Sequence, residues 1–301
     1  MPCEAFIELW IPITIAAAFL QNLRSALQKR LLARLSVNGA TYCRFIYAAP
    51  FAVAYPLLLA LGPETTLPMP NARFVVFAAA GGVAQAVGTA LLVYLFSLRN
   101  FAAGVAYSKT EVVQTAVFSL VILGEIVTAT GAVAIVVSLV GVVLISLVRD
   151  ASRPAWTGRA ALVGLASGGL LGLSAVCYRA AAVALADGGV LMRAAFTLAF
   201  TVLLQGVGMG LWIRARQSGE LVRVFKCWRN AWPVGLVGML GSAGWFTAMT
   251  LENAAYVRAV GQIELVFAFA ASVLFFHERP TPGESLGIAL IMVGVVVLVL
   301  A

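Results

Sequence analysis

The sequence predicts an all-α integral membrane protein in which ten transmembrane helices form a 5+5 inverted-repeat bundle. Three observations predict this fold. Hydrophobic residues make up 62% of the 301 residues and charged residues only 11%, whereas a soluble domain averages about 45–50% and about 25%. Apolar runs long enough to cross a bilayer recur along the whole chain. The second half of the sequence also repeats the first.

Ten apolar runs are the expected crossing helices, because a crossing helix needs about 20 residues. They cover residues 9–28, 38–61, 73–96, 102–123, 129–148, 160–183, 189–213, 231–250, 255–276 and 284–301. Gly62-Pro63 separates the second run from the third, and residues 214–230 form the longest polar connection. Pro280 and Pro282 stand where the last helix begins, a place where a missing N–H costs nothing.

An internal repeat is the most specific feature of the chain. Residues 88–148 overlay residues 241–301 without a gap, and 17 of the 61 positions are identical. Glu111 then matches Glu264, and Thr128 matches Thr281. We expect two five-helix repeats, over residues 1–150 and 154–301.

Five helices per repeat is an odd number, so the second repeat must enter the membrane inverted relative to the first. Inverted repeats are typical of secondary transporters, where substrate binds near the bilayer midplane between the repeats and rocking of one half gives alternating access. A duplicated bundle without transport activity is the alternative.

The chain resembles the EamA-type branch of the drug/metabolite transporter superfamily. The resemblance covers nearly the whole chain and rests on the 5+5 repeat, with an acid ending the fourth and ninth helices in Leu123-Gly124-Glu125 and His277-Glu278-Arg279. It implies a central cavity and transport of amino acids, sugars, nucleotide sugars, other metabolites or toxic compounds. Many relatives have a proline in the middle of the fourth and ninth helices. This chain instead has Val112 and Leu265, each beside a glutamate.

Glu111 and Glu264 are the first candidates for substrate and proton binding. Both lie near the middle of an apolar run, where a charge costs roughly 2.5–3.5 kcal/mol on insertion scales. A carboxylate that gains and loses a proton as access alternates would couple transport to protons, and the pair could also bind an amino group. The alternative is a structural role, with each carboxylate held by Lys109, Arg258 or another buried base.

Further candidates for the substrate site are polar or aromatic residues inside the predicted crossings. The amides could orient a polar substrate or join helices by hydrogen bonds, and the aromatic rings could stack on a substrate or simply fill space. The arginine could bind a substrate carboxylate or extend to the membrane surface. These candidates are Gln262, Gln85, Gln21, Tyr107, Tyr94, Tyr178, Trp245 and Arg44.

The residues also narrow the class of function. There is no P-loop for ATP and no nucleophile-and-base cluster of an enzyme, so we expect no catalysis and no cofactor. The four cysteines form no CxxC pair, and the single histidine cannot build a metal site alone. We expect no nucleic-acid partner, because no basic patch carries interleaved aromatic residues.

We therefore expect a proton-coupled exporter or exchanger of small metabolites, with amino acids as the first substrate class. A lipid or lipid-linked-sugar flippase is the alternative. The expected setting is a monomer that crosses the plasma membrane (the bacterial inner membrane) several times. Basic residues gather in the connections after the first, fifth and seventh runs, which by the positive-inside rule puts both termini outside; the family resemblance puts both inside.

Overall fold

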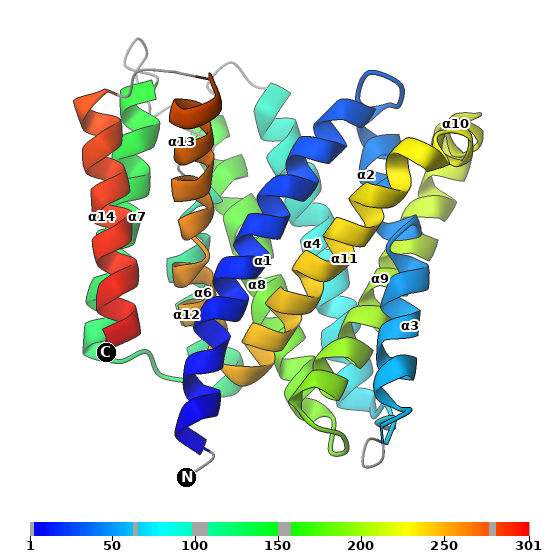
Figure 1. The fold of residues 1–301 in the computed structure, drawn as a ribbon, viewed down its shortest axis with the longest axis horizontal. Helices are drawn as coiled ribbons and strands as arrows, with labels where there is room; N and C mark the ends of the chain where they lie inside the picture. The colour runs from blue at the N-terminus through cyan, green and yellow to red at the C-terminus, as the bar shows by residue number, and fades with distance from the viewer. Residues whose placement is uncertain (1–2, 63–65, 98–107, 150–157, 277–280, 301) are drawn as a thin grey trace. The chain divides into compact units, whose positions relative to one another are not determined.

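The computed structural model describes residues 3–62, 66–97, 108–149, 158–276 and 281–300, and their regular secondary structure is helical (Figure 1). The elements are α1 (Cys3–Leu31), α2 (Val37–Ile46), α3 (Ala49–Leu59), α4 (Ala72–Ser97), α6 (Glu111–Phe118), the π-helix η1 (Ser119–Leu123), α7 (Ala129–Arg149), α8 (Gly158–Ala184), α9 (Val190–Arg216), α10 (Glu220–Lys226), α11 (Trp228–Leu251), α12 (Ala254–Val260), α13 (Ile263–Phe276) and α14 (Pro282–Leu300).

Six segments of the described chain are long and apolar enough to cross a membrane. They are Val37–Leu59, Ala72–Leu92, Ala161–Ala184, Val190–Arg216, Trp228–Leu251 and Pro282–Leu300, and two shorter apolar segments are Glu111–Leu123 and Ala129–Ile145. These segments agree with a membrane helical bundle. The count of ten crossings stays a prediction.

Two of the predicted crossings, residues 38–61 and 255–276, are each divided into two helices. Pro50 stands in the first turn of α3 and lacks the N–H that would continue α2. Between α12 and α13 the backbone tightens, since the N–H groups of Gln262 and Glu264 bond the carbonyls three residues back. Such tightened turns within a helix often mark functional positions.

The polar connection predicted over residues 214–230 is not a continuous loop, because residues 220–226 form the helix α10. Glu220 and Val224 lie one turn apart and are both fully buried. The Glu220 carboxylate accepts a hydrogen bond from the backbone N–H of Ser36, at 2.8 Å, and is ion-paired with Arg223. A polar sequence therefore folds as a short helix that binds the beginning of α2.

The chain divides into two compact units, and each unit takes residues from both halves of the sequence. Unit 1 contains Met1–Gly82 and Tyr178–Leu251, and unit 2 contains Val83–Cys177 and Glu252–Ala301. Unit 1 carries 13 of the 20 basic residues but only 5 of the 12 acidic ones, so the whole net charge of +8 belongs to it. Unit 2 is neutral.

In unit 1, α1 and α11 pack antiparallel along a stripe of glycines on α11. A Cβ at Gly241 would lie 3.3 Å from Leu20 Cβ, and one at Gly244 would lie 2.9 Å from Ala17 Cβ. Because lipid gives no hydrophobic drive between helices, such close backbone approach stabilises the pair. The glycines Gly241 and Gly244 therefore serve helix packing.

In unit 2, α7 and α14 form a second antiparallel pair (Figure 1). A Cβ at Gly141 would lie 2.5 Å from the Gly287 carbonyl, and one at Gly294 would lie 2.7 Å from the Ala134 carbonyl. Gly141 and Gly294 are equivalent in the repeat, and antiparallel pairing of equivalent helices agrees with an inverted repeat.

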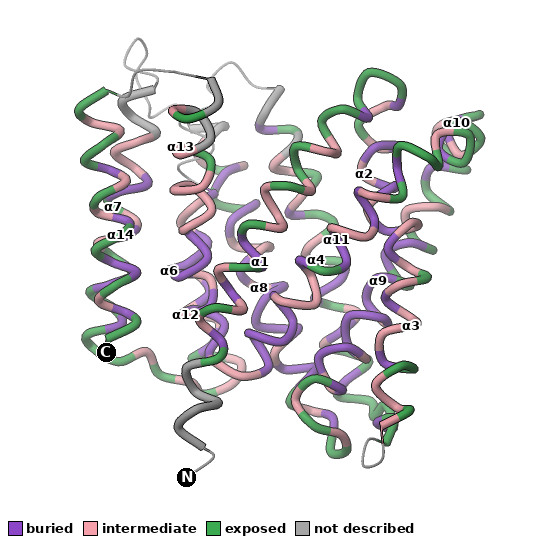
Figure 2. Tube along the Cα trace, viewed as in Figure 1, coloured by how far each residue is buried: buried purple, intermediate pink, exposed green. Residues whose placement is uncertain are grey.

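The outer surfaces of α7 and α14 are apolar. Figure 2 shows exposed and buried residues alternating along both helices, and the exposed side chains include Val133, Val136, Val293 and Val296, each about half exposed at 49–59%. Exposed apolar stripes of this kind need lipid around them. The exposed valines therefore support the membrane location expected from composition.

Candidate functional site

The strongest candidate site lies in unit 2, where α6 begins and where α12 gives way to α13. Glu111 is the first residue of α6 and is 8% exposed. Glu264 is in the first turn of α13. Free N–H groups and the helix dipole favour a negative charge at these positions. The two glutamates that the repeat makes equivalent thus occupy equivalent local structures.

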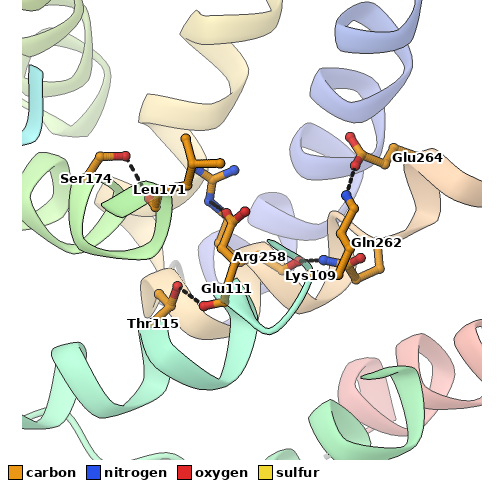
Figure 3. A network of polar contacts seen from close by, with 8 residues as sticks. All are labelled: Lys109, Glu111, Thr115, Leu171, Ser174, Arg258, Gln262 and Glu264. Atoms are coloured by element: carbon orange, nitrogen blue, oxygen red, sulfur yellow. Dashed lines mark hydrogen bonds and ion pairs between the residues drawn. The ribbon is translucent and has the colours of Figure 1, made fainter. Parts of the chain in front are cut away.

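Each glutamate is ion-paired with a base (Figure 3). Arg258 Nε lies 3.1 Å from Glu111 Oε1, although the Nε–H lacks the geometry of a hydrogen bond. Lys109 donates a hydrogen bond to Glu264 Oε1. The four side chains are only 11–18% exposed. The structural partners expected for the glutamates are therefore present, and whether the carboxylates also serve transport stays a prediction.

Gln262 adds a polar atom to this network. Its side chain is 6% exposed, and its Nε2 lies 3.4 Å from the carbonyl of Arg258. Its Oε1 is buried and accepts no hydrogen bond from the described residues. A buried acceptor without a donor costs free energy, so this oxygen is suited to bind a donor on a ligand. Gln262 is also the repeat equivalent of Lys109.

Glycines on α8 position the backbone at Glu111. A Cβ at Gly168 would lie 2.6 Å from the Ser108 carbonyl, and one at Gly172 would lie 2.6 Å from Thr115 Oγ1. The Thr115 hydroxyl in turn donates to the Glu111 carbonyl, at 2.6 Å. Gly168 and Gly172 thus serve helix packing, and the packing holds Glu111 in place.

Four of the predicted site residues belong to unit 1. Tyr178 is 2% exposed, its ring stacks on Phe246 at 4.6 Å between centroids, and its hydroxyl lies 3.4 Å from Gln205 Nε2. Trp245 is buried in α11. Gln21 and Arg44 are half-buried on α1 and α2. Tyr178 is thus a packed core side chain. From the sequence, both this packing role and stacking on a substrate were possible.

Two of the remaining predicted residues, Gln85 and Tyr94, belong to unit 2. Gln85 is half-buried and Tyr94 is 39% exposed, both on α4. Tyr107 lies outside the described residues. The structure therefore brings together Glu111, Glu264 and Gln262 from the predicted set.

Threonines hold the beginnings of α7 and α14. Thr128 Oγ1 accepts a hydrogen bond from Gly131 N, at 3.0 Å, where α7 begins. Its repeat equivalent Thr281 pairs reciprocally with Glu284 where α14 begins, which is a capping box. The helices α7 and α14 therefore begin at threonines that are equivalent in the repeat.

Two acids and two bases give this site a net charge of zero. Such a set can exchange partners with a ligand that carries both charges, or it can take up a proton and release a base. Within the part of the chain that the structure describes, no group of three or more His, Cys, Asp or Glu side chains is placed to hold a metal ion.

Comparisons with known proteins agree with the sequence and the fold. A solved structure titled "Crystal structure of protein" is 16% identical and superposes with a TM-score of 0.73 over 97% of both chains, which shows a shared fold. No curated protein matches the chain by sequence. The EamA-like transporter family model matches residues 8–147 and again residues 159–300. The resemblance seen in the sequence is confirmed, and the chain belongs to the EamA-like transporter family of the drug/metabolite transporter superfamily.

Proposed function

We propose that the protein is a secondary active transporter that exports or exchanges a small metabolite by alternating access, coupled to protons at Glu111 and Glu264. The observation that carries this proposal is the pair of ion pairs, Glu111–Arg258 and Glu264–Lys109, whose two glutamates are equivalent in the internal repeat. The setting is a monomer in the plasma membrane (the bacterial inner membrane).

Proton coupling follows from how such a pair responds to protonation. A proton on Glu264 removes its charge and leaves the ammonium of Lys109 without its counter-charge. An unpaired charge inside a membrane protein is costly, so protonation favours a state in which Lys109 binds another anion or reaches water. Proton binding and substrate binding at one carboxylate then exclude each other, and this exclusion is what an exchanger needs.

The equal numbers of acids and bases support a zwitterionic substrate. The ammonium of an amino acid can replace a base beside Glu111 or Glu264, while its carboxylate takes the released Lys109 or Arg258. Every charge then keeps a partner. A substrate with only one sign of charge would leave one of the site residues unpaired, which costs several kcal/mol in a buried site.

Gln262 supports the same substrate class. Its buried Oε1 can accept one N–H of a substrate ammonium, and an amide offers this bond without adding charge. An ammonium held by Glu264 and Gln262 would have two partners from one segment, two residues apart in the sequence. Amino acids are therefore the substrate class to test first.

Flux across vesicles tests the proposal. The purified protein is reconstituted in liposomes, an outward or inward pH gradient is imposed, and uptake of radiolabelled amino acids is measured one at a time. Gradient-dependent uptake that is lost in Glu111→Gln and in Glu264→Gln, but kept in the control Glu125→Gln, supports the proposal. Scrambling of a labelled lipid without flux of any soluble metabolite contradicts it and favours a flippase.

A further inference from the structure

Gln262 holds a buried oxygen atom that the glutamate network does not use. Its side chain is 6% exposed, and its Oε1 accepts no hydrogen bond from the described residues. The nearby bases are engaged elsewhere: Arg258 is paired with Glu111. Lys109 donates its hydrogen bond to Glu264. A buried acceptor without a donor costs free energy, and an N–H group on a ligand would remove this cost.

The partner of the amide nitrogen determines which way this oxygen is directed. Gln262 Nε2 lies 3.4 Å from the carbonyl of Arg258, one turn back on the same segment (Figure 3). A carbonyl oxygen only accepts hydrogen bonds, so the nitrogen and not the oxygen of the amide must face it. Because the nitrogen and oxygen of a planar amide point apart, Oε1 is directed away from this carbonyl.

The internal repeat gives a reason for a neutral side chain at this position. Gln262 is equivalent to Lys109, and Arg258 is equivalent to Val105. Each repeat thus supplies one base to the site, from a different one of the two equivalent positions. A lysine at 262 would set a third base against two acids, whereas glutamine keeps the site neutral and adds an acceptor.

We propose that Gln262 determines substrate specificity by requiring N–H groups on the charged nitrogen of a zwitterion, an inference that rests on the proposed function. The Glu264 carboxylate and Gln262 Oε1 are two acceptors, so an ammonium with two or more N–H groups satisfies both. A quaternary ammonium carries the same charge but no N–H, and it leaves Oε1 buried and unpaired. Sites built to hydrogen-bond a substrate group strongly reject analogues that lack the group. Amino acids with a primary or secondary ammonium are therefore bound, and betaines are rejected.

The experiment compares four small zwitterions that differ in the number of N–H groups on the charged nitrogen. Glycine has three, N-methylglycine two, N,N-dimethylglycine one and glycine betaine none. Binding to the purified full-length protein is measured as the rise in melting temperature with ligand concentration. The variant is Gln262→Met. The matched control is Gln205→Met, which replaces a glutamine that is 8% exposed and whose Nε2 donates to the Gly82 carbonyl.

We expect glycine and N-methylglycine to bind the parent protein, because each can satisfy both acceptors. N,N-dimethylglycine leaves one acceptor unpaired and should bind roughly tenfold or more weakly, and glycine betaine should bind more weakly still. Gln262→Met removes one acceptor and keeps an unbranched side chain. The loss of affinity between N-methylglycine and N,N-dimethylglycine should therefore disappear in this variant, whereas Gln205→Met should keep the order of the parent.

The same variants test the unpaired oxygen without any ligand. Gln262→Met removes a buried acceptor that has no donor, so the melting temperature of the ligand-free protein should hold or rise. Gln205→Met removes an amide with a hydrogen-bond partner, so its melting temperature should fall. An equal fall for both variants would show that the Gln262 amide already has its partners in the folded protein, which overturns the proposal.

Three binding results would also overturn it. The first is no binding of glycine or N-methylglycine, and the second is equal binding of all four compounds by the parent. The third is the parent's order in Gln262→Met, which would mean that the size of the ammonium and not its N–H groups decides.

Flux in liposomes separates this proposal from the transport proposal. Proton-driven uptake of glycine by a parent protein that binds all four compounds equally would refute only the role of Gln262. The predicted order of binding without any proton-driven flux would refute coupled transport and leave the role of Gln262 in binding intact.

Discussion

Glu111 and Glu264 are equivalent in the internal repeat, and each is paired with a base from the other repeat. Arg258 of the second repeat lies 3.1 Å from Glu111, while Lys109 of the first repeat binds Glu264. The two ion pairs link the beginning of α6, with Lys109 just before it, to the α12–α13 segment. Loss of charge on either carboxylate would therefore break an ion pair between the two repeats. Coupling of the repeats needs a link of this kind.

The Lys109–Glu264 pair can be measured by a double-mutant cycle. Removing one partner leaves the other charge poorly compensated, so Lys109→Met and Glu264→Gln should each destabilise the protein by about 3–5 kcal/mol. The double variant should recover part of this loss, with a coupling free energy of about 0.5–3 kcal/mol. Thermal unfolding of the four proteins gives the cycle, and purely additive effects would show that the two side chains do not interact.

The α8 glycines should tolerate no side chain at the contact with Glu111. Gly168→Ala brings a Cβ to 2.6 Å from the Ser108 carbonyl, and such overpacking costs about 1–3 kcal/mol. Gly208 on α9 is the matched control, because a Cβ there meets nothing within 4 Å and alanine is the better helix former. Melting temperatures should fall for Gly168→Ala and hold or rise for Gly208→Ala; the same sign for both would contradict the close contact.

Thr128 should stabilise the beginning of α7 through its side-chain hydroxyl. Thr128→Ala removes the acceptor for Gly131 N and should cost about 0.5–2 kcal/mol, the usual range for an N-cap. Thr130→Ala, one residue inside the same helix on an exposed position, should cost little. Equal losses in thermal unfolding would argue against a capping role for Thr128.

Glu220 should hold α10 against the beginning of α2. Its side chain is fully buried and binds both Ser36 N and Arg223, so Glu220→Ala leaves a backbone donor without its partner, at a cost of about 1–3 kcal/mol. Cys227 directly follows α10 and is half-buried, so its labelling by a maleimide should become faster. Unchanged labelling and stability would show that α10 is held by other contacts.

Much of the fold was predictable because hydrophobicity and the repeat act over long stretches of chain. Helices at 73–96, 129–148, 160–183 and 189–213 are found within a few residues of their predicted bounds. The divided helices were not predicted, since Pro50 and Gly261-Gln262 sit inside apolar runs whose hydrophobicity does not change. The helix α10 was missed because its stability depends on a buried contact with Ser36, far away in the sequence.

The candidate site was predicted only where the repeat marked it. Glu111 and Glu264 stood out as equivalent charges in apolar runs, and their partners Lys109 and Arg258 were named as a structural alternative. Which base binds which acid was not predictable, because pairing between repeats depends on tertiary structure. Tyr178 and Gln205 meet for the same reason. Their 27-residue separation gives no periodic signal.

Proton-driven flux in liposomes tests the transport proposal most directly. The parent protein, Glu111→Gln, Glu264→Gln and the control Glu125→Gln are reconstituted at equal density, and uptake of an amino acid that binds the parent is followed with and without a pH gradient. We expect the gradient to drive uptake in the parent and the control and in neither site variant. Gradient-driven uptake that persists in both site variants would contradict coupling at these two glutamates.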